Sequence, residues 1–422
     1  MKARLSLVLA ATLGLAACQG DETAPSASSA ASPVVVQENF LTIANDASLE
    51  TPQRGRLSAI RQRANNDDTH LARLATGPAA LLRRGGALRL AVAPGVQVVA
   101  QGERVEQRSA NDISWGGRVQ GVNNGYVQMV YSPEGVTGTV TLDRVQYRIE
   151  PLGNGLHAVS RMDQNGFPSE HPADHPAGAL DVPPPTNYLA AKAPEGTVGA
   201  AALSTINVLV VYTASAASAA GNIASKIQLA VDETNQSYVN SGININMVRV
   251  HTAQVTYNES GRSFSQHVAA LRSTTDGVMD NVHTLRNTYA ADVVLLVVND
   301  SEACGIASSI GSTATSAFAV AHWDCITGYY SFGHEIGHLQ GARHDRFVDG
   351  STTPYAYGHG FIPAAKNWRT VMAYGNNCSN CTRIQYWSNP LKTYSGVAMG
   401  TVAYEDNARV LNLTAASVAA YR

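Results

Sequence analysis

The spacing of apolar residues separates a β-rich first half of the chain from a second half of mixed structure. Between residues 87 and 161, apolar and polar residues alternate in short runs such as 88–92 and 125–131, and Gly-rich turns separate the runs. Alternation with a period of two is typical of strands. Earlier polar stretches such as 57–74 have helical spacing. We therefore predict a small β-rich domain over residues 40–170.

The second half alternates continuous apolar runs with segments of helical spacing. Residues 206–212 and 293–298 are apolar almost throughout, which is typical of strands buried on both faces. Residues 217–238 place apolar side chains at helical spacing, and Gly242 follows as a stop signal. Strands that alternate with helices predict an α/β domain with a mixed, mostly parallel sheet over residues 205–422.

Between the two domains, residues 171–204 contain Pro183-Pro184-Pro185 and many Ala and Gly residues. This composition predicts an exposed linker of the kind that proteases cut. The linker holds two histidines, His171 and His175. Histidines scattered among Pro and Ala are more often solvated than bound to metal, so we expect no ligand role for either.

The N-terminal residues have the features of an export signal. A short cationic start precedes 13 uncharged residues, a run too short to cross a membrane, and predicts a signal peptide over residues 1–17. The sequence Leu15-Ala-Ala-Cys18 resembles the lipobox of bacterial lipoproteins, in which the Cys becomes the lipidated N-terminus. With Gln19 next, the resemblance implies an outer-membrane lipoprotein on a flexible tether, residues 18–39. Ordinary secretion with an incidental Cys is the alternative.

Composition narrows the range of functions. The 422 residues are 45% hydrophobic and 15% charged, which excludes a wholly disordered chain. Lys and Arg number 30 against 32 Asp and Glu, for a formal net charge of −2. The chain therefore lacks an overall positive charge, and we expect no nucleic-acid partner.

A histidine-rich segment in the second half carries the candidate chemistry. His334 and His338 are four residues apart, so both imidazoles lie on one face of a helix. They can supply two nitrogens to one zinc ion, and Gly341 lets the chain turn back and bring His344 as the third. Three protein ligands leave a position for water, which is typical of catalytic zinc. Glu335, beside the first ligand, is the candidate general base.

This pattern, His-Glu-x-x-His-x-x-Gly-x-x-His, resembles the metzincin metalloproteases, in which a Met-turn follows it. Met372, in Val371-Met372-Ala373-Tyr374, fits that turn. The resemblance implies a metzincin catalytic domain with an active-site helix, one catalytic Zn²⁺ and Met372 beneath it. The alternative, a chance cluster on a buried helix, would bury a Glu and three His residues without partners, at a high cost.

Neighbouring residues resemble the bacterial reprolysin-like branch, and within it the peptidyl-Asp metalloendopeptidases. Asp345 follows the third His, and Cys304-Gly-Ile-Ala and Trp387-Ser-Asn-Pro also match. Tyr374 departs from the reprolysin pattern and is similar to the Met-x-Tyr of astacins and serralysins, where it can ligate zinc or face the oxyanion. We treat it as a candidate oxyanion stabiliser. The resemblance covers about residues 205–422.

The same resemblance bears on substrate binding. Peptidyl-Asp proteases cleave before an acidic residue, which implies a cation in the pocket after the scissile bond. In metzincins the chain past the Met-turn builds that pocket, and here Arg383 is the basic residue of that stretch, with Arg369 just before and Lys392 just after. A solvated Arg383 is the alternative. The resemblance also makes residues 315–323 the edge strand above the cleft, with a buried core strand as the alternative.

Four cysteines remain once Cys18 is set aside. An even number of cysteines in an exported chain indicates disulfides. Of three possible connectivities, we favour Cys304–Cys325 with Cys378–Cys381, because both pairs are local. The latter pair also fits a redox or zinc site, but the chain has neither a second CxxC nor a thioredoxin-like context for it.

The family resemblance makes the first domain a propeptide. This domain has no Cys with which to block zinc, as many reprolysin propeptides do, so Asp163, Asp174 or steric cover would serve instead. A cut in the linker would remove the propeptide and the lipid anchor together and release an extracellular enzyme. The chain has no EF-hand or RTX-type repeat, which leaves a calcium requirement open.

Two functional hypotheses follow. The first is a zinc endopeptidase made as a lipid-anchored or secreted zymogen. The second is a non-enzymatic surface lipoprotein that uses a zinc-stabilised fold for binding. Glu335 favours the enzyme, because a binding module needs no base beside its metal. We expect protein or peptide substrates, membrane contact only through the lipid on Cys18, and a monomer.

Overall fold

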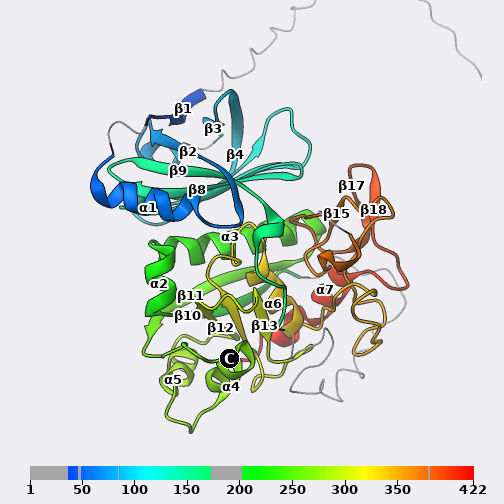
Figure 1. Ribbon diagram of the computed structural model, residues 1–422. Coiled ribbons are helices and arrows are strands. Elements are labelled where there is room, and N and C mark those ends of the chain that lie inside the picture. The colour runs from blue at the N-terminus through cyan, green and yellow to red at the C-terminus, as the bar shows by residue number, and fades with distance from the viewer. Residues whose placement is uncertain (1–36, 46–48, 84, 173–201, 379–380) are drawn as a thin grey trace, which may run out of the picture. The chain divides into compact units, whose positions relative to one another are not determined.

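The computed structural model describes residues 37–45, 49–83, 85–172, 202–378 and 381–422 (Figure 1). The predicted signal peptide, Cys18 with its tether, and most of the linker lie outside the described residues, as do His175 and Asp174. Within the described part of the chain, no helix is both long enough and apolar enough to cross a membrane.

Nine strands of the first domain close into a barrel, drawn in blue to green in Figure 1. Their order around the wall is β1-β2-β9-β8-β7-β6-β5-β4-β3, and neighbours are antiparallel except β1 with β3. The strands are β1 (Gln37–Ile43), β2 (Asn66–Leu74), β3 (Ala87–Ala93), β4 (Val96–Ser109), β5 (Asp112–Val119), β6 (Gly125–Ser132), β7 (Gly135–Leu142), β8 (Val145–Gly153) and β9 (Leu156–Met162). Inward-facing residues such as Leu90, Trp115 and Ile149 form one buried core.

The helical spacing over residues 57–74 is only partly realised. Helix α1 (Thr51–Arg61) contains the beginning of that stretch, but its second part is strand β2. Strand β2 pairs with β1 on one side and β9 on the other, and Leu71 and Ala72 are buried. Sheet pairing and burial therefore override the local spacing.

The second domain is built on a five-stranded sheet of order β11-β10-β12-β14-β13. Its strands are β10 (Ser204–Thr213), β11 (Ile245–Val255), β12 (Val293–Val298), β13 (Gly305–Ala307) and β14 (Phe318–His322). Neighbouring strands are parallel except β13, which is antiparallel to β14. The predicted α/β class, with a mixed and mostly parallel sheet, is confirmed.

Helices cover both faces of this sheet, which explains the continuous apolar runs of its strands. On β10, Val208 and Val210 join the core that contains Ile336 of α6, whereas Leu209 joins the opposite core with Val268 of α4. The helices are α2 (Ala214–Ala220), α3 (Ile223–Ser241), α4 (Phe264–Arg272), α5 (Asn281–Thr288), α6 (Ser331–Leu339) and α7 (Asn407–Val418). The single helix predicted over 217–238 is instead two, α2 and α3.

The strand expected at the edge of the sheet is an interior strand. Strand β14 pairs with β12 on one side and with β13 on the other, and all five of its residues are buried. The edge is β13, which pairs only with β14 within the sheet. The prediction that residues 315–323 bind substrate was therefore wrong, and the buried-core alternative is correct.

The chain after α6 forms two short strand pairs beside the site. Strand β15 (Trp368–Arg369) pairs with β16 (Thr382–Arg383), and β17 (Asn389–Tyr394) pairs with β18 (Val397–Met399).

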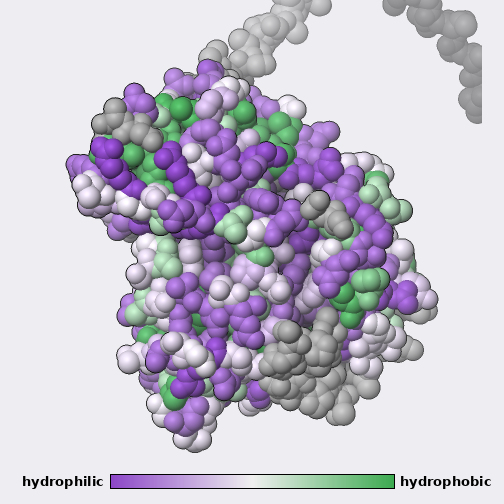
Figure 2. Space-filling model, viewed as in Figure 1, coloured by the Kyte–Doolittle hydropathy of each residue, from purple (hydrophilic) through white to green (hydrophobic). Residues whose placement is uncertain are grey.

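Polar residues cover most of the face shown in Figure 2, with apolar residues between them. Exposed large apolar side chains such as Ile43 and Leu391 belong to different domains.

Buried charges join the barrel to the second domain. The Asp324 carboxylate accepts a hydrogen bond from Arg148 Nη1 of the barrel at 2.8 Å, and Lys226 Nζ of α3 lies 3.2 Å away. Asn65 Nδ2, also from the barrel, donates to Oδ2 at 2.8 Å. Burial alone would raise the pKa of Asp324, but Arg148, Lys226 and Arg63 outweigh it and hold that pKa below its usual range.

We expect Asp324→Ala to lower the free energy of unfolding by about 3–5 kcal/mol, because it leaves Arg148 and Lys226 buried without their carboxylate. Urea titration measures the change. Asp67→Ala is the control, since the Asp67–Arg161 ion pair is about half exposed and worth at most about 1 kcal/mol. A depressed folded pKa stabilises the protein above the ordinary carboxylate range, so the difference should shrink only as the pH falls below about 4. Equal losses in both variants would contradict this assignment.

Candidate active site

Helix α6 carries three of the predicted site residues, His334, Glu335 and His338, and all three are buried. The helix is approached closely by its neighbours. A Cβ on Gly337 would lie 2.5 Å from the Trp387 ring and 3.3 Å from Met372 Sδ. Glycine at this position therefore lets Met372 pack directly against the helix.

The chain leaves α6 at Gly341, whose φ of +103° belongs to the region that favours glycine. This turn returns His344 to the helix. His359, a buried residue that sequence reasoning missed, hydrogen-bonds through Nδ1 to the His344 carbonyl oxygen at 2.7 Å. No spacing or motif singles out His359, because its role is to hold the main chain of a residue that the turn delivers.

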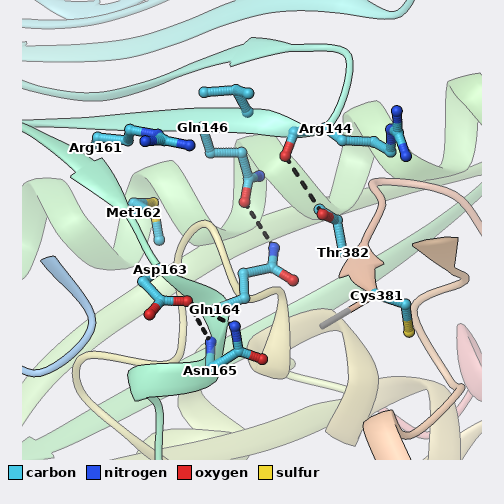
Figure 3. Close-up of a pocket in the computed structure, with 10 residues that line it drawn as sticks. Arg144, Gln146, Arg161, Met162, Asp163, Gln164, Asn165, Cys381 and Thr382 are labelled. Carbon is cyan, nitrogen blue, oxygen red and sulfur yellow. Dashed lines mark hydrogen bonds between the residues drawn. The ribbon is translucent and has the colours of Figure 1, made fainter. Parts of the chain in front are cut away.

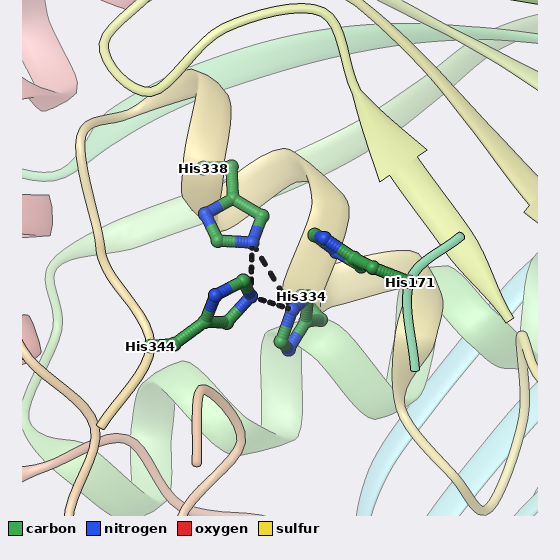
Figure 4. A group of neighbouring side chains, drawn as sticks. All are labelled: His171, His334, His338 and His344. Atoms are coloured by element: carbon green, nitrogen blue, oxygen red, sulfur yellow. Dashed lines mark hydrogen bonds between the residues drawn. The ribbon is translucent and has the colours of Figure 1, made fainter. Parts of the chain in front are cut away.

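The three predicted imidazoles converge through their Nε2 atoms (Figure 4). His338 Nε2 lies 2.8 Å from His344 Nε2, and His334 Nε2 lies 3.1 Å from each of the others. Nitrogens around a tetrahedral zinc, with bonds of about 2.0–2.1 Å, would be roughly 3.3 Å apart. The arrangement therefore fits a zinc ion after small adjustments.

Hydrogen bonds at the far side of two rings fix their orientation. His334 Nδ1 donates to the Val371 carbonyl and His338 Nδ1 to the Ala342 carbonyl, both at 2.9 Å. Each Nε2 lone pair then faces the centre of the cluster, the arrangement typical of metal-ligating histidines. Burial lowers the pKa of His334 to about 4 and those of His338 and His344 well below the ordinary value. Neutral imidazoles are the form that binds metal.

A fourth imidazole, from His171, completes the cluster. A ligand atom of each of the four histidines lies within 4.8 Å of the others. The His171 ring centroid is 4.7 Å from that of His344, and the His171 side chain is only 6% exposed. The expectation that His171 is a solvated linker residue was wrong. It lies nine residues after the end of β9 at Met162, so the barrel, not local sequence, delivers it to the site.

Of the two acidic candidates for a blocking group, the structure describes only Asp163. Asp163, one of the two acidic candidates, accepts a hydrogen bond from the Asn165 main chain at 2.9 Å and caps a short 3₁₀ turn. Asp174 lies outside the described residues. The Asp163 carboxylate is therefore engaged in this turn and does not belong to the histidine cluster.

Glu335 is buried between the three imidazoles and strand β13. Its Oε2 lies 3.4 Å from His171 Nε2, and burial raises the pKa of Glu335 to about 8. A Cβ on Gly305 of β13 would overlap Oε1 of Glu335. Gly305 therefore leaves the space that the carboxylate occupies.

Tyr374 and Asp345 lie on the other side of His344. The Tyr374 and His344 ring centroids are 4.3 Å apart, and the Tyr374 hydroxyl has no hydrogen-bond partner among the described residues. The Asp345 carboxylate accepts a hydrogen bond from the Tyr374 main-chain N–H at 2.8 Å. Asp345 thus ties the residue after the third histidine to the turn that contains Met372.

Arg383 is fully buried, not solvated or half-buried as the sequence suggested. Its Nη1 donates to the Tyr329 carbonyl at 2.9 Å, and its guanidinium lies 4.4 Å from the centroid of the Tyr329 ring. Arg369 is also buried and donates through Nη2 to the Tyr329 hydroxyl at 3.0 Å. Burial lowers the pKa of Arg383 to about 9. Both guanidinium groups face one carboxylate, that of Glu170.

Two disulfides hold the chain around these groups. Cys304, next to β13, is bonded to Cys325 in the loop before α6, and Cys378 is bonded to Cys381 in the segment before β16. The predicted local pairing is therefore the one in the structure.

Three neutral imidazoles beside a buried carboxylate and a sheet edge define the site of a metal-dependent peptidase.

Comparison with known proteins agrees with this class. The family model described as Metallo-peptidase family M12 matches residues 202–388. Two relatives named peptidyl-Asp metalloendopeptidase are similar. The one from Xanthomonas campestris pv. campestris is 48% identical over 297 residues, 70% of this chain and 69% of the relative. The one from Stenotrophomonas maltophilia strain K279a is 47% identical over 300 residues, 70% of each.

A solved structure, metalloproteinase-II from Bacteroides fragilis, aligns with 62% of this chain and 82% of its own at 14% identity, with a TM-score of 0.40. The sequence relatives decide the assignment. This chain belongs to the family of the peptidyl-Asp metalloendopeptidases within the M12 metallopeptidases, and it is a metalloendopeptidase. M12 metallopeptidases use zinc, and the histidine cluster can bind it.

We expect Gly305→Ala to lower peptide hydrolysis by the active enzyme by about 100-fold, because the added Cβ displaces the Glu335 carboxylate. Zinc content should stay unchanged, since the substitution does not touch the three histidines of α6 and its turn. Peptide kinetics and metal analysis measure the two effects. Gly350→Ala is the control, because a Cβ there meets nothing within 4 Å. Unchanged hydrolysis in folded Gly305→Ala would show that Glu335 tolerates displacement.

Proposed function

We propose that this protein is a zinc endopeptidase that uses Glu335 as its general base and favours cleavage before an acidic residue. The observation that carries the proposal is the position of the Glu335 carboxylate, buried beside three converging imidazole nitrogens. The second hypothesis, a binding module, is set aside because nothing in binding alone explains a buried carboxylate at a metal centre in an endopeptidase family.

His334, His338 and His344 would hold the zinc ion, which when bound would supply a Lewis acid for peptide hydrolysis. Glu335 accepts the proton of the attacking water and delivers it to the departing amine. The Tyr374 hydroxyl, which has no competing partner among the described residues, is free to donate to the developing oxyanion. Hydrogen bonds from His334 and His338 to main-chain carbonyls keep the ligand geometry fixed meanwhile.

The proposed preference for an acidic substrate residue is based on two buried guanidinium groups. Arg383 and Arg369 both lie against Tyr329, close to the turn that follows Met372. A planar guanidinium donates parallel hydrogen bonds to a carboxylate, so the pair suits an Asp or Glu side chain of the substrate. An apolar side chain would leave both charges buried without a partner, which is costly.

The barrel and the linker fit a zymogen. We propose that a cut between about residues 171 and 204 separates the barrel from the peptidase domain, which begins near β10. Lipidation of Cys18 would make that cut a release from the membrane as well, and secretion without lipid would leave only the change in activity. The interface between barrel and peptidase domain is rich in hydrogen bonds and ion pairs, such as Thr139 Oγ1 to Glu233 Oε1 at 2.8 Å. Polar interfaces of this kind suit domains that separate.

We expect Glu335→Gln to lower turnover of peptide substrates by at least about 100-fold, because the amide cannot accept the proton of the water. The variant should bind zinc as the wild type does, since the three histidines are unchanged. Steady-state kinetics of the activated enzyme and its zinc content are the measurements. Turnover near the wild-type rate in a folded, zinc-loaded variant would rule out Glu335 as the base.

We expect Arg383→Ala to lower kcat/KM for peptides with Asp after the scissile bond by about 10–100-fold, the loss of one charged hydrogen bond. The same peptide with Leu at that position should lose little or gain. Lys392→Ala is the matched control, because Lys392 is exposed outside this cluster. Parallel losses for both peptides would move the preference to Arg369 or show that Arg383 is only structural.

A further inference from the structure

The ten residues after β9 lie across the candidate active site. Gln164 anchors the start of this segment: it donates to the Gln146 amide oxygen of the barrel at 2.7 Å (Figure 3). It also donates to the Arg383 carbonyl at 3.1 Å. The Arg383 main-chain N–H donates back to Gln164 Oε1 at 2.6 Å. Phe167 then stacks on Tyr329, with ring centroids 4.4 Å apart. The segment is therefore fixed beside Arg369, Arg383 and Tyr329, which together we call the arginine pocket, before it reaches the metal centre.

Main-chain carbonyls of this segment next accept hydrogen bonds at the edge of the sheet, from the first residue of β13 and from the residue before it. The Cys304 N–H donates to the Ser169 carbonyl at 2.7 Å, and the Gly305 N–H donates to the Glu170 carbonyl at 3.2 Å. Addition of an extended peptide to a sheet edge is a common mode of peptide recognition. The segment thus uses the edge that a substrate peptide would need.

The Glu170 side chain fills the arginine pocket. Its Oε1 accepts hydrogen bonds from Arg369 Nη2 and from the Tyr329 hydroxyl, both at 3.1 Å. Its Oε2 forms an ion pair with Arg383 Nη2. The Glu170 side chain is only 9% exposed. An acidic side chain of the chain itself therefore occupies the site that we assign to the acidic residue of a substrate.

His171 follows directly and enters the histidine cluster (Figure 4). Three imidazoles leave one position of a tetrahedral zinc for water, and a fourth imidazole would close it. His171 Nε2 also lies 3.4 Å from Glu335 Oε2, in the space between the base and the cluster. With His171 there, the attacking water has no place beside Glu335.

We propose that Ser169-Glu170-His171 is a built-in inhibitor in which His171 is the fourth zinc ligand and Glu170 blocks the acid-binding pocket. The inference rests on the proposed function, since it assigns the zinc site and the arginine pocket their roles there. It differs from plain steric cover by the barrel, because two side chains occupy the two positions that catalysis and recognition need.

The order of the two side chains would protect this segment from cleavage by the protein itself. Cleavage before Glu170 requires the Ser169 carbonyl to reach the metal. That carbonyl is instead hydrogen-bonded to the Cys304 N–H. The acidic residue comes before the group at the metal, whereas in a substrate it follows the scissile carbonyl. The segment fills the pocket without presenting a bond for attack.

The first test counts zinc ligands in the full chain with its linker uncut. X-ray absorption at the zinc edge should report four imidazoles in the wild type and three with one oxygen in His171→Ala. His70→Ala, a barrel histidine paired with Asp68, is the matched control and should keep four. A wild-type precursor with three imidazoles and one oxygen would overturn the proposal.

The second test measures peptide hydrolysis by the same uncut proteins. His171→Ala and Glu170→Gln should each raise it about 10–100-fold over the wild-type precursor, the effect of losing one charged contact. His171→Cys should remain latent, because a thiolate also ligates zinc, and alkylation should then activate it. The four cysteines of the second domain are disulfide-bonded and should not react. Precursors of both loss variants that are as latent as the wild type would leave steric cover as the explanation and refute the inhibitor.

A third measurement separates this proposal from the proposed function. Wild-type protein that has been cut in the linker and freed of its barrel should hydrolyse Asp-containing peptides. If it does not, the proposed function fails, while the ligand count still decides the role of His171. If it does, and the uncut wild type shows only three imidazoles, the inhibitor fails and the proposed function stands. Glu170→Gln leaves the histidines intact and keeps the test decisive if His171→Ala does not fold.

Discussion

The close packing of helix α6 is the constraint on which the site depends. The helix carries two imidazoles and a carboxylate into the interior, where an unpaired polar group is costly. Glycines make that burial possible: Gly337 admits Trp387 and Met372 to the helix surface, and Gly305 of β13 leaves room for Glu335. The sheet edge, the Met372 turn and the metal ligands are thus fixed relative to one another by contact with a single helix.

The barrel meets this assembly through charges and hydrogen bonds more than through a shared apolar core. Each domain has its own hydrophobic core, and the Asp324 cluster and the Thr139–Glu233 hydrogen bond cross between them. Burial raises the pKa of Glu233 to about 7 and lowers the pKa of Lys226 to about 8. The interface therefore contains groups that titrate near neutral pH. A smaller apolar cluster also crosses between the domains, with Met162 and Phe167 on the barrel side and Cys304, Cys325 and Tyr329 on the other. A partly polar interface also has a smaller apolar area to expose when the domains separate.

Much of the fold follows from periodicity. The apolar runs at 206–212 and 293–298 correspond to β10 and β12, and their burial on both faces explains why they do not alternate. The apolar spacing gave a wrong prediction for β2, where pairing with neighbouring strands outweighed the local preference for helix. It also gave a wrong prediction for β14, because a short apolar run can be either an edge strand or an interior strand. A run of this length has the same spacing in an edge strand and in an interior strand. Only the antiparallel return of β13, at Gly305–Ala307, places β14 inside the sheet.

Local spacing alone was enough to predict the groups that lie within a few turns of the chain. His334, Glu335, His338 and His344 are close in sequence, and helix geometry with one glycine turn is enough to bring them together. The same holds for the two disulfides, whose partners are local. The positions of Glu170 and His171, in contrast, depend on contacts between distant parts of the chain. Their approach depends on a closed barrel whose last strand ends beside Arg383, and on hydrogen bonds between segments far apart in the chain. No local spacing encodes contacts of that kind, because they arise from the docking of one domain on another.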